Sequence, residues 1–379
     1  MKVMKAPAPP MRRKDRCLAL IALLSQHRLG PCRGFAFVDR ARPLGAPARP
    51  LPPSRRLTAR TRRVRHATDD DNTGCTSLLR TYFSMMRPVT IVQAVGAFLV
   101  GLLVTAAPGD GPRPGSTAAA CASVYLSYGA GMAMNDVADG EVDSMHGTKS
   151  QRAVASGAVT TAAGWTFCAL LSSASLALAR LAELPLGGPG HRGAGPRFVR
   201  WTAANTSIMA AYALGLQKVF LAKNLVCGYL ACSPLIGALQ LITNGVPSGG
   251  GAAVHGKLYW LAAVGFPLQV SREILKDIED LDVDSGVKDT LPLVIGSEAS
   301  RRVAFGLALA ANAAMVILPH YWRMFASRPP VYACSVAVGT AMCVTASGLP
   351  VERGQRLLKK SIYVVLLGMI ASLVIQGYR

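Results

Sequence analysis

Six aspartates form two sets with identical spacing, and this repeat is the feature of the sequence most able to support chemistry. The sets are Asp136, Asp139 and Asp143 in the stretch AMNDVADGEVD, and Asp277, Asp280 and Asp284 in the stretch DIEDLDVD. Intervals of three and then four residues place the three carboxylates of a set on one face of a helix. Each set follows an apolar stretch, so we expect each helix to present its carboxylates at its C-terminal end.

Three carboxylates on one helical face are unfavourable unless a positive partner is present. They repel one another at these intervals, and they meet the negative end of the helix dipole. Hard divalent cations such as Mg²⁺ take oxygen ligands, and Mg²⁺ usually keeps phosphate oxygens and water in its coordination shell. Two matched sets therefore indicate a site that binds a diphosphate through Mg²⁺.

Basic residues accompany both sets and could neutralise the phosphate charge that the metal leaves. Lys149, Arg152, Arg272, Lys276 and Lys288 flank the two sets in the sequence, and Lys218 and Lys223 are expected on the same side of the membrane, after the fourth span. A site of acids, divalent cations and bases can ionise an allylic diphosphate, because the metals and bases stabilise the leaving diphosphate. Apolar surroundings would hold the isoprenoid chain and keep water away from the allyl cation.

The elements that must position these side chains are apolar helices. The chain is 51% hydrophobic and only 16% charged, whereas soluble domains carry about 25% charged residues. Nine apolar stretches are candidate membrane spans, at 89–107, 116–134, 156–179, 202–217, 225–242, 258–271, 303–318, 331–349 and 361–376. Helices satisfy their own backbone in lipid, so we predict an all-α integral membrane protein with about nine transmembrane helices.

The two acidic loops are expected on the same side of the membrane. They follow the second and the sixth span, as in an internal repeat with parallel orientation. Of the 24 Lys and Arg residues after residue 66, 15 lie on the side of these loops. By the positive-inside rule, this bias places the acidic loops in the cytoplasm or the stroma.

Residues 1–74 differ in composition from the rest, and we predict that they form a targeting leader. Residues 1–66 hold 17 Lys or Arg and two acidic residues, so the net charge of +21 mostly describes this segment and does not indicate nucleic-acid binding. An apolar core at 17–24 follows basic residues, as in a signal peptide, and a basic Pro-rich stretch follows it, as in a transit peptide. This order favours a plastid membrane, with the mitochondrial inner membrane as the alternative, and leaves residues 75–379 as the membrane domain.

From about residue 80 onward the chain resembles the UbiA-type intramembrane prenyltransferases. NDVADGEVD matches the first motif of that family, NDxxDxxxD, and DIEDLDVD matches the second, DxxDxxxD. MRPVT at 86–90 resembles the opening before the family's first helix, and YALGLQKVFLAKNLV resembles the segment after its fourth helix. The resemblance implies a bundle of nine helices and Mg²⁺-dependent transfer of a prenyl group from its diphosphate to an acceptor.

The same resemblance implies roles for individual residues. The six aspartates would bind Mg²⁺–diphosphate, and Asn135 would orient or ligate in the first site. Lys149, Arg152, Lys218 and Lys288 would contact phosphate. Tyr212 is a candidate for acceptor binding, with simple packing in a helix of small residues as the alternative.

The acceptor is the least determined part of this interpretation. SREILKDIED resembles the branch of the family that prenylates glycerol-phosphate lipids. The predicted plastid leader instead favours the quinone, tocopherol or chlorophyll pathways. On the strength of the leader, we expect an aromatic or quinone-precursor acceptor such as homogentisate, with chlorophyll-synthase-like and geranylgeranylglyceryl-phosphate-type transfer as alternatives.

Two other classes of protein fit the sequence less well. A cation-coupled transporter would carry acids near the middle of the membrane, whereas these acids end helices at one surface and have bases beside them. A scaffold that retains the fold without activity does not require the complete acid set. The expected partners are therefore a prenyl diphosphate, a lipophilic acceptor and membrane lipid, without nucleic acid.

Overall fold

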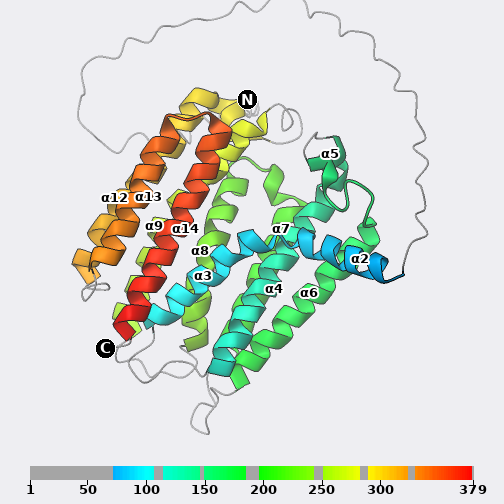
Figure 1. Cartoon of the computed structure of the whole chain (residues 1–379), viewed down its shortest axis with the longest axis horizontal. Coiled ribbons are helices and arrows are strands. Elements are labelled where there is room, and N and C mark those ends of the chain that lie inside the picture. The colour runs from blue at the N-terminus through cyan, green and yellow to red at the C-terminus, as the bar shows by residue number, and fades with distance from the viewer. Residues whose placement is uncertain are drawn as a thin grey trace, which may run out of the picture. The chain divides into compact units, whose positions relative to one another are not determined.

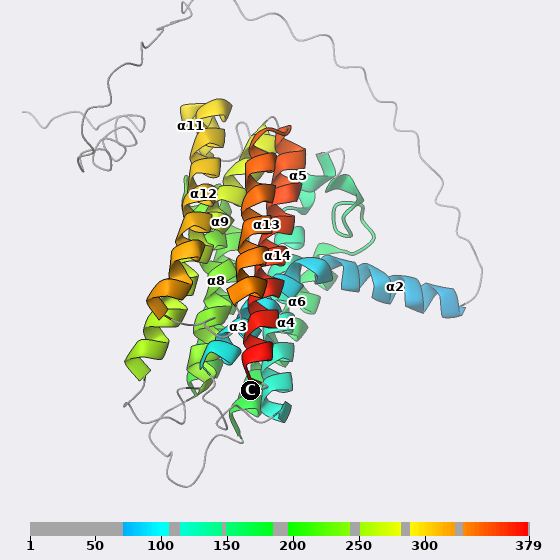
Figure 2. The ribbon, with the colours of Figure 1, turned by 60° about the vertical axis from the view of Figure 1, so that its left-hand side comes forward.

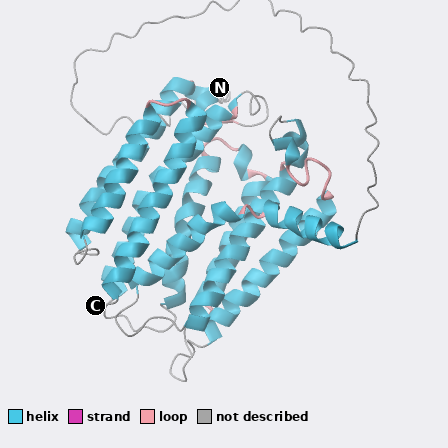
Figure 3. Ribbon diagram, in the orientation of Figure 1, coloured by secondary structure: helices cyan, strands magenta, loops and turns pink. Residues whose placement is uncertain are grey.

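The computed structural model describes residues 71–105, 114–145, 149–184, 196–242, 251–281, 289–322 and 329–377, and in these ranges its regular elements are helices joined by short loops (Figure 3). The long helices are α3 (Pro88–Thr105), α4 (Pro114–Ala138), α6 (Thr161–Glu183), α7 (Arg197–Leu214), α8 (Ala222–Ile242), α9 (Gly251–Glu279), α12 (Ser297–Trp322), α13 (Pro329–Ser347) and α14 (Val351–Gly377). The short elements are α2 (Asp71–Met85), α5 (Gly140–Met145), α11 (Leu291–Ile295) and two 3-10 turns, η1 (Lys149–Gln151) and η3 (Leu216–Lys218). The predicted all-α class is confirmed.

Each of the nine predicted spans overlaps one of the long helices. Within the described ranges, six helices are long and apolar enough to cross a membrane, namely α3, α6, α8, α12, α13 and α14. The chain is therefore a multi-pass membrane protein. The other three, α4, α7 and α9, are not among these six, so the exact number of nine crossings stays a prediction.

The buried apolar residues form two clusters that meet along α3 and α8. One cluster joins α4, α6 and α7, and the other joins α9, α12, α13 and α14. On α3, Phe98 belongs to the first cluster and Val100 to the second, and on α8 the same holds for Leu241 and Leu239. The long helices run side by side, and α2 runs across them (Figures 1 and 2). The bundle thus has two halves, and each half carries one acidic set.

A proline in α8 explains a polar network between three helices. Pro234 has no backbone N–H, so the carbonyl of Leu230, four residues earlier, loses its usual helical partner. The hydroxyl of Tyr128 on α4 donates to this carbonyl and lies 2.8 Å from Ser233 Oγ. Ser233 Oγ in turn donates to Asn205 Oδ1 on α7 at 2.8 Å. The network fixes the positions of α4, α7 and α8 where the two halves meet.

The predicted leader lies mostly outside the described residues. The signal-like core at 17–24 and the basic stretch after it belong to residues 1–70, which precede the first described residue, Asp71. The helix α2 begins at Asp71, close to the predicted start of the membrane domain. The boundary at residue 74 stays a prediction.

The close approach of α3 and α8 predicts opposite effects for two Gly→Ala substitutions. A Cβ on Gly101 would lie 2.6 Å from Ala238 Cβ and 3.3 Å from Leu235 Cα, whereas a Cβ on Gly306 of α12 would meet nothing within 4 Å. We expect Gly101→Ala to lower the free energy of unfolding by about 1–3 kcal/mol through overpacking. We expect Gly306→Ala to raise it by up to about 1 kcal/mol, because Ala is the better helix former. Denaturant unfolding in detergent measures both, and equal effects would contradict the proposed close contact.

Candidate active site

Both acidic sets lie where their helices end, as the sequence predicts. Asp136 is in the last turn of α4, Asp139 is in the turn between α4 and α5, and Asp143 is in α5. Asp277 is in the last turn of α9, and Asp280 directly follows that helix. The third member of the second set, Asp284, and the nearby Lys288 lie outside the described residues.

A lysine from the first half contacts an aspartate of the second half. Lys149 Nζ, in the turn η1 that follows the first acidic set, donates to Asp280 Oδ1 at 2.9 Å. Near the end of the second acidic loop, the backbone N–H of Asp289 lies 3.5 Å from the carbonyl oxygen of Lys218 in η3. The two loops therefore come together at one end of the bundle, in agreement with a parallel internal repeat.

Two arginines neutralise the first acidic set. Arg152 Nη1 lies 2.5 Å from Asp143 Oδ2 and 3.4 Å from Asp136 Oδ1. Arg87, in the turn before α3, also forms an ion pair with Asp136. Asp136 and Asp143 are buried, so their carboxylates lose hydration at a high cost in free energy. The ion pairs compensate for that cost.

Amide side chains hold the middle aspartate of the first set. Gln217 Nε2, in η3, donates to Asp139 Oδ1 at 2.8 Å, and Asn135 Nδ2 donates to Asp139 Oδ2 at 3.2 Å. Asn135 Oδ1 is buried and has no hydrogen-bond partner in the structure. An oxygen in this state is available to a cation.

Asp277 of the second acidic set and the neighbouring Glu273 are paired with bases of α8 and α9. Asp277 is fully buried, forms an ion pair with Lys223 of α8 and accepts a hydrogen bond from Asn224 Nδ2 at 2.9 Å. One turn earlier on α9, Glu273 accepts from Arg272 Nη1 at 3.0 Å and from Lys276 Nζ at 2.9 Å. Pairing of this kind is what buried carboxylates require.

Charge also sets the acidity of Asp280. Burial raises the pKa of its carboxyl, but the hydrogen bond and the positive charge of Lys149 lower it more, so that the pKa lies below its ordinary value. Asp280 is therefore a carboxylate at neutral pH, which is the form that binds a cation.

The donor set fits Mg²⁺ in the way that Mg²⁺ is commonly bound. Among the described residues, no three His, Cys, Asp or Glu side chains form a preformed metal cage. Mg²⁺ rarely uses such cages and is usually held by one or two carboxylates together with the phosphates of a substrate. The carboxylates at this end of the bundle, with the unpaired Asn135 Oδ1, match that requirement.

A cavity of about 300 Å³ lies beside the acidic sets, between α3, α4, α7, α8, α9 and α14. Its charged lining consists of Arg87, Arg272, Lys276, Lys359 and one carboxylate, Glu273. Asn135 and Tyr212 also line it, so Tyr212, the candidate for acceptor binding, does face the cavity.

An apolar pocket adjoins this cavity and extends towards Leu261 and Met369. The pocket and the cavity share Gln93, Ala231 and Gln269 in their linings. The polar end and the apolar end together suit an amphiphilic substrate.

Several site residues were not singled out by the sequence. Lys218 is exposed on η3, and the base of this segment that pairs with an acidic set is Lys223. Arg87 could have been found, because it stands inside MRPVT, the stretch that resembles the family's opening. Gln217 and Glu273 carry no motif signal, because an amide or a carboxylate becomes part of a site only through its partners in space.

Comparison with known proteins identifies the class of protein. The model of the UbiA prenyltransferase family matches residues 94–370, which is most of the helical bundle. The chain belongs to the UbiA prenyltransferase family. It is therefore an enzyme that transfers a prenyl group, and the predicted resemblance of the chain to this family is confirmed.

Two curated relatives of this chain carry the same name. A digeranylgeranylglyceryl phosphate synthase from Halobacterium salinarum is 29% identical over 283 residues, which are 74% of this chain and 92% of the relative. A synthase of the same name from Methanopyrus kandleri is 26% identical over 302 residues, which are 78% of this chain and 100% of the relative. The match therefore extends over nearly the full length of both relatives.

Solved structures share the fold at low sequence identity. A digeranylgeranylglyceryl phosphate synthase structure has a TM-score of 0.56 at 20% identity, and covers 79% of this chain and 99% of its own. A UbiA homolog from Archaeoglobus fulgidus, bound to GPP and Mg²⁺, has a TM-score of 0.53 at 14% identity and covers 78% of this chain and 99% of its own. These similarities establish the fold of the bundle.

The buried pair of Lys223 and Asp277 predicts a large effect on stability. Lys223→Met would leave the fully buried Asp277 without its ion-pair partner, and such a loss typically costs about 3–5 kcal/mol. Lys218→Met, five residues earlier and exposed, is the matched control and is expected to change the free energy of unfolding by less than about 0.5 kcal/mol. Denaturant unfolding in detergent measures both variants. An unchanged stability of Lys223→Met would mean that the two side chains do not form a buried pair.

Proposed function

We propose that this enzyme transfers a prenyl group from a prenyl diphosphate to a hydroxyl group of a glycerol-phosphate lipid. One observation carries the proposal: four basic side chains and a single carboxylate line the cavity beside the acidic sets. Such a lining favours a second anionic substrate next to the donor. The name of the curated relatives, digeranylgeranylglyceryl phosphate synthase, supports a phosphate-bearing glycerol lipid as that substrate.

Donor binding is assigned to the end of the bundle where the acidic sets meet. The six aspartates and Asn135 would hold Mg²⁺, which supplies Lewis-acid stabilisation of the leaving diphosphate. Lys149 and Arg152 lie among these carboxylates and are positioned to neutralise phosphate oxygens, and Lys218 and Lys288 are proposed for the same role. The prenyl chain extends into the apolar pocket, whose lining includes Leu261, Met315 and Met369.

The reaction exchanges one carbon–oxygen bond for another. The bond between C1 of the prenyl group and the bridging oxygen breaks, and its electron pair leaves with the diphosphate. The hydroxyl oxygen of the acceptor then bonds to C1, and its proton passes to a basic oxygen, for which the released diphosphate is available. Because the pocket excludes water, the allylic carbon is protected from hydrolysis.

Homogentisate remains the alternative acceptor. It carries a carboxylate, so the basic lining is compatible with it, and the predicted leader favours it. The glycerol-phosphate lipid is preferred because a headgroup phosphate carries more negative charge and because the relatives support it. A chlorophyll-synthase-like acceptor is the third outcome to be tested.

The location in the cell is proposed from the sequence alone. We infer a plastid membrane, with the mitochondrial inner membrane as the alternative, and with the acidic loops on the stromal side. The leader that supports this inference lies outside the described residues.

Membranes that contain the enzyme should distinguish the acceptors directly. We expect radiolabelled geranylgeranyl diphosphate to label geranylgeranylglyceryl phosphate, in a reaction that stops when EDTA removes Mg²⁺. Homogentisate and chlorophyllide form the other arms of the panel. Labelling of homogentisate alone would overturn the proposed acceptor while leaving the class of enzyme intact.

Neutral substitutions in the acidic sets test the donor site. Asp139→Asn and Asp280→Asn keep the shape of the side chain but remove its charge, and each is expected to lower turnover by about 100-fold or more. Both variants should remain folded in the membrane. Glu298→Gln removes an exposed carboxylate of α12 that pairs only with Arg302 on the same helix, and it is expected to keep normal turnover. Wild-type rates in both aspartate variants would exclude the proposed donor site.

A further inference from the structure

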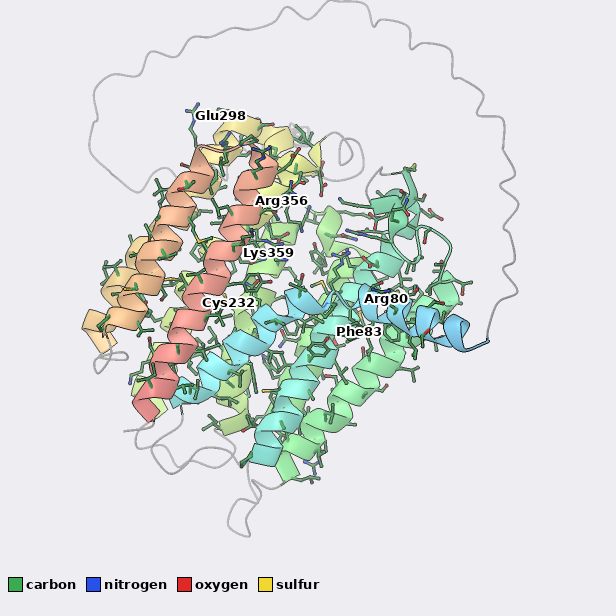
Figure 4. The ribbon with its side chains drawn as sticks, viewed as in Figure 1. Arg80, Phe83, Cys232, Glu298, Arg356 and Lys359 are labelled. Atoms are coloured by element: carbon green, nitrogen blue, oxygen red, sulfur yellow. The ribbon has the colours of Figure 1, made fainter. Side chains whose placement is uncertain are left out.

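Lys359 is a charged residue inside a candidate membrane span. The span covers Val351–Ile375 of α14, and at 1.5 Å per residue Lys359 lies about 12 Å from the start of the helix. Figure 4 shows it on α14 between Arg356, nearer the end with the acidic loops, and Cys232, deeper in the bundle. A lysine at such a position is costly, and it commonly marks a substrate pathway.

The direct contacts of Lys359 are with neutral groups, and the carboxylate of Glu273 lines the same cavity. Its ammonium lies 3.4 Å from Thr90 Oγ1 on α3 and 6.0 Å from the centre of the Tyr363 ring. None of the described carboxylates forms an ion pair with it, whereas Lys149, Lys223 and Lys276 each have one. Lys359 is thus a lysine of the site whose direct contacts are neutral groups.

Two neighbouring side chains on α9 also have unused hydrogen-bonding atoms. Arg272 Nε is buried and has no partner, although Nη1 of the same guanidinium donates to Glu273. Gln269 is 7% exposed, and its Nε2 donates to Glu273 at 3.1 Å, which leaves Oε1 buried and without a partner. Both residues line the same cavity as Lys359. A donor, an acceptor and a cation are therefore available around one space.

We propose that Lys359 and Arg272 form an anion subsite for the phosphate monoester of the acceptor lipid, separate from the diphosphate site at the acidic sets. Gln269 Oε1 accepts a hydrogen bond from a glycerol hydroxyl in the same cavity. The proposal rests on the proposed function and makes it more specific, because it says which end of the cavity recognises the acceptor. Lys359, which forms no ion pair with a described carboxylate, gains a negatively charged partner when this anion binds.

Lys359 borders the same cavity as Arg87 and Asn135 of the donor site, but it forms no ion pair with a described aspartate. Lys359 is on α14 and Thr90 is on the first turn of α3, whereas the aspartates are at the ends of α4 and α9 and in the loops that follow. The bases that contact those aspartates are Arg87, Lys149, Arg152 and Lys223. Removing the charge of Lys359 should therefore weaken acceptor binding and spare donor binding.

The test measures binding and turnover for Lys359→Met, Lys359→Arg and the exposed neighbour variant Lys360→Met. Full-length enzyme in detergent is titrated with radiolabelled geranylgeranylglyceryl phosphate, and with the same lipid without its phosphate. We expect Lys359→Met to weaken binding of the phosphate-bearing lipid, and to raise its KM, by about 10- to 100-fold. The KM of the prenyl diphosphate should be unchanged, Lys359→Arg should restore most of the affinity, and Lys360→Met should resemble the wild type.

The outcomes separate the subsite from the proposed function. If wild-type enzyme prenylates the phosphate-bearing lipid but Lys359→Met binds it normally, the subsite is refuted and the function stands. A rise in the KM of the prenyl diphosphate in Lys359→Met would also refute the subsite, since it would place Lys359 at the donor. If wild-type enzyme binds the lipid but does not prenylate it, the proposed function fails while loss of binding in Lys359→Met still supports the subsite. If wild-type enzyme does not bind the lipid, the subsite is overturned.

Discussion

The compensation of buried carboxylates by bases from other helices is the constraint on which this structure depends. Asp136 and Asp277 are buried at the ends of apolar helices, and Asp143 is buried in α5, where an unpaired carboxylate would be strongly destabilising. The bases that pair with them come from the turn before α3, from the loop after α5 and from α8. Most of these ion pairs join segments that are distant in the sequence, so ion pairing helps to fix the positions of the loops.

The two-part core explains why these pairs can form at one end. Each half of the bundle has its own apolar cluster, and α3 and α8 belong to both. Close contact at Gly101 and the network around Pro234 fix how the halves meet. The cavity lies at this meeting place, so its lining combines residues of α3 and α4 with residues of α9 and α14. A site of this kind requires both halves of the repeat.

Much of this arrangement could be predicted from the sequence, because its signals are local. The spacing of the aspartates placed them at helix ends, and the apolar stretches anticipated the long helices. Asn135, Lys149 and Arg152 were found because they stand close to a motif in the chain. Glu273, Gln217 and Lys359 were not singled out, because their significance depends on contacts between helices. Lys359 in particular is adjacent to another lysine in the sequence, and only burial distinguishes the two.

The contact between Lys149 and Asp280 has a consequence for selectivity. In the structure the ammonium of Lys149 and the carboxylate of Asp280 pair with each other. A cation that binds Asp280 without an anion would have to displace Lys149, and an anion that binds Lys149 without a cation would have to displace Asp280. A prenyl diphosphate that arrives with Mg²⁺ would offer phosphate oxygens to Lys149 and a cation to Asp280 at the same time. The ion pair that is lost would then be replaced by new contacts of each residue with an opposite charge. Such a site would discriminate against free metal and free diphosphate alike.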